Sequence, residues 1–104
     1  MSPNPNYTAG RRFEYERLKY WKEVMDHTCL RTAGSHGFAD LITISPFGDV
    51  QFIQCKRVST QAEATQLLKE FKKNPPLWHR PNACYDQVME VRVKGNKEIQ
   101  SVRV

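Results

Sequence analysis

The sequence predicts an α/β fold on a single sheet, with a helix, three strands, a helix and two strands in that order. Three observations support this prediction. Apolar residues near the N-terminus recur at helical spacing. Two β-rich runs are joined by a short turn that contains Pro and Gly. A second helical stretch begins with a capping signal and precedes two more β-rich runs. The 104 residues suffice for one modest core. We expect a flexible arm over residues 1–9 and a single domain over 10–104.

Composition and charge limit the class of protein. Hydrophobic residues make up 39% of the chain and charged residues 26%, which is typical of a folded soluble protein. No apolar run approaches the ~18 residues that span a bilayer, and the polar start differs from a secretory signal, so we expect a cytoplasmic protein without membrane contact. A net charge of +5 favours a polyanionic partner. The cysteines Cys29, Cys55 and Cys84 lack C-x-x-C spacing and predict reduced, mostly buried thiols.

The first helix is expected from Arg11 to about His27. Leu18, Trp21 and Met25 follow one stripe at helical spacing, and Glu14 falls on that same stripe. An ionised carboxylate on a packing face is costly unless it is paired, protonated or bound to a metal. Glu14 is therefore a candidate site residue, and an ion pair with a lysine or arginine is the alternative.

A short strand, a loop and a hairpin follow the first helix. Cys29–Thr32 predicts a strand, residues 33–38 a loop, and residues 39–57 an antiparallel hairpin around the turn at 45–49. The β-rich runs of the hairpin are Leu41–Ile44 and Val50–Ile53.

The register of the hairpin brings polar residues together. If Ile44 lies opposite Val50, Asp40 lies opposite Gln54, and alternation places Lys56 on the same face. The rest of that face carries the apolar side chains of Ile42, Ile44, Val50 and Phe52. Polar groups at the end of an apolar face are costly unless they form hydrogen bonds or ion pairs, or serve a functional site.

The second helix and the last strands have clear boundaries. Thr60 and Glu63 form a capping-box pattern, which predicts a helix over residues 61–73. Basic residues in its last turn suit the helix dipole, so they need not bind a ligand. A loop over 76–82 follows. The final strands are expected over 85–93 and 98–104.

The polar residues have a shared chemistry. Glu14, Asp40 and the amide oxygen of Gln54 are hard oxygen ligands of the kind that Mg²⁺ prefers. Lys56 could orient or deprotonate an attacking water, or neutralise charge that develops on a phosphate. A solvated lysine at a strand end is the alternative for Lys56.

Three segments together resemble a known superfamily. Gly10–Glu14, Arg31–Asp40 and Gln54–Lys56 are similar to the motifs of the PD-(D/E)XK nucleases, in particular the archaeal-type Holliday junction resolvases and related phage nucleases. The resemblance covers about residues 8–58. It implies a restriction-endonuclease-like core, with a mixed central sheet flanked by two helices, that often forms a homodimer. It also implies hydrolysis of DNA with Mg²⁺ or Mn²⁺ in a bacterial, archaeal or phage-infected host cell.

The resemblance assigns roles to individual residues. Glu14 and Asp40 match metal-associated acids, Gln54 the second motif acid and Lys56 the catalytic lysine. Ser35 matches a polar residue of the loop that approaches the cut strand. Gln54 stands where most members have Glu, so weaker metal affinity is expected.

DNA contacts are expected from residues that flank this site. Basic and loop residues supply phosphate contacts, and Trp78 either stacks on an unpaired base or plugs the surface over the second helix. The candidates are Arg11, Arg12, Arg31, Ser35, His36, Arg57, Trp78, His79 and Arg80.

The resulting expectation is a metal-dependent endonuclease that cuts branched DNA. Two alternatives stay open: a general repair or restriction-type nuclease for duplex or single strands, and an inactive nucleic-acid-binding module. We expect Asp40→Ala or Lys56→Ala to abolish cleavage and to leave folding and DNA binding largely intact.

Overall fold

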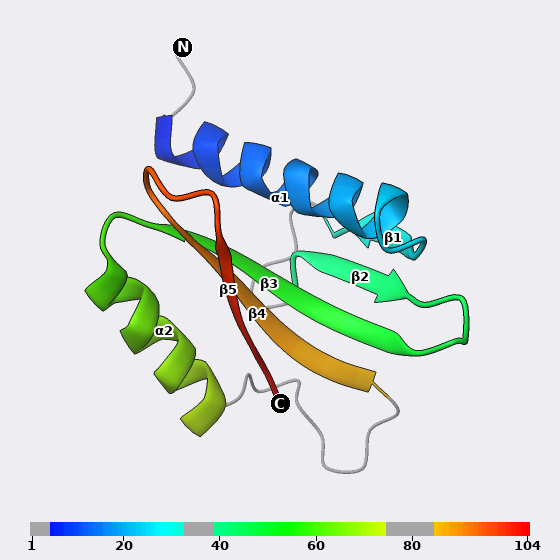
Figure 1. Cartoon of the computed structure of the whole chain (residues 1–104). Helices are drawn as coiled ribbons and strands as arrows, with labels where there is room; N and C mark the ends of the chain where they lie inside the picture. Colours follow the sequence, from blue (N-terminus) through cyan, green and yellow to red (C-terminus); the bar gives the residue numbers. More distant parts are fainter. Residues whose placement is uncertain (1–4, 33–38, 75–84) are drawn as a thin grey trace.

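The computed structural model describes residues 5–32, 39–74 and 85–104, which form a five-stranded mixed sheet with two helices (Figure 1). The strands lie in the order β1-β2-β3-β4-β5; β3 and β4 are parallel, and the other neighbours are antiparallel. The predicted α/β class with a mixed sheet and two helices is confirmed. The elements are α1 (Pro5–Glu23), β1 (Thr28–Arg31), β2 (Leu41–Ile44), β3 (Val50–Val58), α2 (Gln61–Lys73), β4 (Tyr85–Val93) and β5 (Ile99–Arg103).

The two helices cover opposite faces of the sheet (Figure 1). α1 packs mainly on β1 and β3, and α2 packs mainly on β4 and β5. Because side chains alternate along each strand, the sheet contributes to two separate apolar clusters. The cluster under α1 contains Phe13, Trp21, Cys29, Leu41, Ile53, Cys55 and Val88. The cluster under α2 contains Val58, Ala64, Phe71, Met89 and Val91.

Helix α1 is shifted toward the N-terminus relative to the prediction. It begins at Pro5, so residues 5–9 are helical rather than part of an arm. Proline is tolerated at a helix start because its missing N–H would have no partner there. The helix ends at Glu23, and Asp26 adopts a left-handed conformation with φ of 57°, which ends a helix. Met25 therefore lies beyond the helix and is 42% exposed. Residues 1–4 lie outside the described part. No helix in the described ranges is long and apolar enough to cross a bilayer.

The β2–β3 hairpin has the predicted register, with Ile44 opposite Val50. Its turn is closed by Ser45, whose N–H donates to the Asp49 carbonyl at 2.8 Å, and Gly48 supplies the positive φ of 92°. The buried face of the hairpin, however, is the face opposite the apolar one. Ile44 is 39% exposed, since α1 packs against the other side. The side chains buried on that side are Leu41, Thr43, Gln51 and Ile53.

Helix α2 begins and ends as predicted, at Gln61 and Lys73. The Thr60 hydroxyl accepts a hydrogen bond from the N–H of Glu63 at 3.2 Å, as in a capping box. The Glu63 carboxylate accepts from the Thr60 hydroxyl at 3.3 Å. The helix is thereby held at the crossover between the parallel strands β3 and β4.

A buried ion pair holds α1 against β4. Nε and Nη2 of Arg17 each donate to one carboxylate oxygen of Glu90 at 2.8 Å, and the two side chains are 13% and 3% exposed. Two parallel hydrogen bonds between oppositely charged groups allow both charges to be buried. Glu14 lies about one turn before Arg17 on the same helix, so this pair also fixes the position of Glu14.

Arg17→Met should destabilise the fold by about 3–5 kcal/mol, because it leaves Glu90 as an unpaired buried charge. Urea unfolding followed by circular dichroism measures the change. Replacing both partners, with Arg17→Met and Glu90→Leu, should restore most of the lost stability. A single variant that unfolds at the same urea concentration as the wild type would contradict the assigned role of this pair.

Candidate functional site

The candidate site lies where β2 separates from β3. β2 begins at Leu41 opposite Ile53, whereas β3 continues beside β4 to Val58. Asp40 occupies the point of separation. Its N–H donates to the Ile53 carbonyl at 2.9 Å, and its Oδ2 accepts from the N–H of Cys55 at 2.8 Å. The carboxylate thus satisfies a backbone donor that the β2–β3 ladder does not reach.

Asp40 is also attached to the segment that follows β1. Its carbonyl accepts a hydrogen bond from the N–H of Thr32 at 2.9 Å. The Thr32 hydroxyl donates to the carbonyl of Ala39, the neighbour of Asp40. The backbone of Asp40 is therefore held from both sides, and Oδ1 is the oxygen through which this residue can meet a cation.

Glu14 approaches the same place from α1. Its Oε1 lies 3.8 Å from Nε of Arg31, and the two side chains are 19% and 14% exposed respectively. The Arg31 guanidinium also lies 4.9 Å from the ring centre of Tyr15. The ion pair that was the alternative for Glu14 is therefore present, with Arg31 as the cation.

The two acids interact electrostatically. Burial raises the pKa of Glu14 above its ordinary value, and the negative charge of Asp40 raises it further. Burial also raises the pKa of Asp40, although the backbone hydrogen bond to its carboxylate opposes the change. The positive charges of Arg31 and Lys56 lower both pKa values without cancelling the effect of burial. The two carboxylates therefore share one electrostatic environment, in which their cations compensate them only in part.

Lys56 and Gln54 follow each other on one face of β3. Lys56 is exposed, and its charge acts on both acids. Gln54 is half-buried and lines a hollow against α2. The charges of Glu14, Asp40 and Lys56 thus act on one another, although Lys56 and Gln54 project from the face of β3 opposite the one that α1 covers. Gln54 has its neighbours on the side of the sheet that α2 covers. These neighbours are Leu67, Glu70, Phe71, Asn74 and Met89.

The donor set suits a hard divalent cation rather than zinc. Among the residues that the structure describes, no three His, Cys, Asp or Glu side chains gather into a group that could hold a metal. Two carboxylates remain, those of Glu14 and Asp40. Mg²⁺ is commonly bound by one or two carboxylates, with water and substrate phosphate as its other ligands. Glu14 and Asp40 are therefore the residues of this site that could hold such an ion.

Cys55, between the two motif residues of β3, is not suited to nucleophilic chemistry. Its side chain is buried in the cluster under α1. Burial raises the pKa of its thiol far above the ordinary value, so the thiolate is not formed near neutral pH. Burial also raises the pKa of the Cys29 thiol, to about 11. Buried reduced thiols were predicted, and Cys84 lies outside the described residues.

The predicted DNA contacts differ in accessibility. Arg12 and Arg57 are exposed, whereas Arg31 is mostly buried beside Glu14. Arg11 is exposed at the surface of α1, and its charge acts on Glu14. The remaining candidates, Ser35, His36, Trp78, His79 and Arg80, lie outside the described residues.

Sequence reasoning missed Arg92, which lines a hollow together with Arg12 and Arg57. Arg57 and Arg92 are partners in the parallel register of β3 and β4. A parallel pairing of these strands would have revealed the neighbourhood, but the sequence pattern does not specify which strands pair across a helical crossover.

Comparison of the chain with protein-family models, with curated proteins and with solved structures finds no match in any of the three. The functional interpretation therefore depends on the motifs and on the geometry of the site.

Asp40→Ala should destabilise the protein by about 1–3 kcal/mol, because the N–H of Cys55 loses its acceptor. This revises the expectation that the alanine variant folds normally. Asp40→Asn keeps an oxygen acceptor and should lose clearly less stability. Thermal unfolding of the two variants side by side tests the difference, and equal loss in both would contradict the structural role of this carboxylate.

Glu14→Gln should gain stability relative to the wild type as the pH rises from 4 toward 7. The pKa of Glu14 is raised above its ordinary value of 4.5, so the folded protein favours the protonated acid. The stability that this preference provides is complete at low pH and is lost as the pH rises through the folded-state pKa. Urea unfolding at a series of pH values gives the difference between variant and wild type. A difference that is independent of pH would contradict the raised pKa.

Proposed function

We propose that this chain is a metal-dependent DNA endonuclease with a restriction-endonuclease-like core, similar to the Holliday junction resolvases of the PD-(D/E)XK superfamily. The observation that carries the proposal is that the partly buried carboxylates of Glu14 and Asp40 lie close enough for the charge of Asp40 to act on Glu14, and for the charge of Lys56 to act on both. Two partly buried acids whose charges raise a pKa are costly for a fold. A divalent cation is a common means of offsetting such a cost.

The arrangement of the elements supports the same proposal. The acids come from α1 and from the residue before β2, and the lysine comes from the part of β3 that extends past β2. The resemblance assigns the metal-binding and catalytic roles to these same three residues. The net charge of +5 suits a DNA partner.

Each residue has a definite role in phosphodiester hydrolysis. Glu14 and Asp40 would hold Mg²⁺ or Mn²⁺, with water and a phosphate oxygen of the substrate as further ligands. When bound, the metal stabilises negative charge on the phosphate and increases the acidity of water. Lys56 donates hydrogen bonds that orient the attacking water or stabilise the phosphate oxygens. The water oxygen forms a new P–O bond and releases a proton to the solvent. The bond between phosphorus and the leaving oxygen breaks, and that oxygen takes up a proton from the solvent.

The alternative of an inactive nucleic-acid-binding module has two observations in its favour. Arg31 already pairs with Glu14, and Gln54 has its neighbours beside α2. Calorimetric titration with Mn²⁺ separates the two functions. Binding that disappears in Asp40→Asn supports the metal site, whereas no binding to the wild type supports the inactive module.

The purified protein should cut a four-way junction in Mg²⁺ or Mn²⁺, and Lys56→Gln should reduce the rate by about 10²–10³-fold. The assay compares a junction, a flap, a duplex and a single strand on denaturing gels. Lys69→Gln, an exposed lysine on α2, removes the same charge and should leave the rate unchanged. Equal cleavage of the junction and its component duplexes would favour the repair or restriction-type nuclease, and no cleavage of any substrate would refute the proposal.

A further inference from the structure

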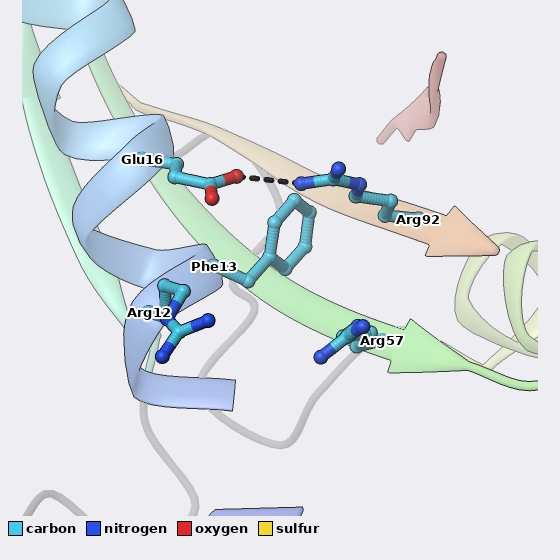
Figure 2. A pocket seen from close by; sticks show the side chains of 5 residues that line it. All are labelled: Arg12, Phe13, Glu16, Arg57 and Arg92. Carbon is cyan, nitrogen blue, oxygen red and sulfur yellow. Dashed lines mark hydrogen bonds and ion pairs between the residues drawn. The ribbon is translucent and has the colours of Figure 1, made fainter. Parts of the chain in front are cut away.

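A small hollow with three guanidinium groups lies on the α1 side of the sheet (Figure 2). Arg12, Phe13 and Glu16 of α1 line it together with Arg57 of β3 and Arg92 of β4, and its volume is about 140 Å³. Figure 2 shows the side chains of α1 and of the two strands bordering one space, with the Phe13 ring between them. The concentration of positive charge in so small a space favours an anionic ligand.

Two of these arginines are direct neighbours in the sheet. Arg57 lies opposite Arg92 in the register of β3 and β4, and like charges in that relation destabilise a sheet. Arg92 is compensated, because its Nη1 donates to Glu16 at 2.6 Å and its Nε to the Asn96 carbonyl at 3.1 Å. The carboxylate of Glu16 in the hollow is thus engaged by Arg92, while Arg12 and Arg57 have no ion-pair partner among the described residues.

We infer that this hollow binds a phosphate group of a nucleic-acid strand, held by Arg12 and Arg57 with Arg92 beside them. The planar donor fork of a guanidinium matches two phosphate oxygens, and two such forks can hold one phosphate from different sides. That the phosphate belongs to a nucleic acid rests on the proposed function, whereas its binding is argued from the hollow alone.

The hollow and the candidate site are built from neighbouring residues of the same two elements. Arg57 directly follows Lys56 on β3, and Arg12 shortly precedes Glu14 on α1. Side chains alternate along a strand, so Arg57 and Lys56 project from opposite faces of β3. A nucleic-acid strand that passes the end of β3 can therefore place one phosphate group at Lys56 and another phosphate group in the hollow.

The test is the binding of a fluorescently labelled duplex and four-way junction without divalent metal, followed by anisotropy. Arg12→Gln and Arg57→Gln should each weaken binding by about tenfold. Because both arginines hold one phosphate, the double variant should lose less than the product of the two single losses. It should also lower the slope of log K against log salt concentration by about 0.9, the value for one phosphate of a duplex.

Two further variants sharpen the test. Lys69→Gln with Lys72→Gln removes two exposed charges from α2 and should change binding by less than about threefold. Glu16→Gln removes the carboxylate from the hollow and frees Arg92, so it should tighten binding. Circular dichroism checks that each variant is folded, as expected for exposed side chains.

Duplexes with and without 5′-phosphates identify the source of the phosphate. An effect of the arginine variants on both duplexes indicates an internal phosphodiester, and an effect confined to the phosphorylated ends indicates a terminal phosphate. Either result supports a phosphate site. If the arginine double variant binds like the lysine double variant, or if the single losses multiply, the inference is overturned.

Failure of this inference and failure of the proposed function give different results. If the wild type cuts DNA and the arginine variants bind DNA normally, the proposed nuclease activity stands and the proposed phosphate site is rejected. If the wild type cuts no substrate but the losses of binding at Arg12 and Arg57 are coupled, the phosphate site stands and the proposed nuclease activity is rejected.

Discussion

One hydrogen bond determines the shape of the candidate site, the bond from the N–H of Cys55 to the carboxylate of Asp40. β3 loses its neighbour at this point and would expose an unpaired backbone donor. The carboxylate takes the place of the missing strand, so β2 and β3 can diverge without an unsatisfied group. At this point of separation the charge of Asp40 acts on Glu14, and the charge of Lys56 acts on both acids. The pair of Arg17 and Glu90 contributes from a distance, because it sets the position of α1 on which Glu14 lies.

Much of the fold was predictable because the relevant signals are local. Thr60 and the residues after it specify where α2 begins, and the Pro/Gly turn specifies the register of Ile44 and Val50. The ends of α1 were less accurate, since Pro5 and Asp26 act through backbone conformations that apolar periodicity does not reveal. The buried face of the hairpin was also missed, because the packing of α1 decides which side is covered.

For the candidate site, the spacing on one hairpin and one helical stripe predicted that Glu14, Asp40 and Lys56 lie near one another, and the structure shows that their charges interact. Their hydrogen bonds and ion pairs were not predictable in the same way. The sequence could not show that Asp40 accepts a backbone N–H, because the same carboxylate could equally project into solvent. Local sequence patterns also cannot predict contacts between segments that are far apart in the chain. Arg17 and Glu90 are 73 positions apart, and Arg57 lies next to Arg92 only because β3 and β4 pair in parallel.

The buried thiol of Cys55 provides this protein with an internal reporter. The sulfur lies beneath α1, while the backbone N–H of the same residue holds the carboxylate of Asp40. An alkylating reagent can reach that sulfur only when α1 lifts from the sheet or β3 comes apart, since the closed state protects it and keeps it protonated. The labelling rate at this position, followed by mass spectrometry, therefore measures how often the layer that carries Glu14 detaches, without any substrate being present.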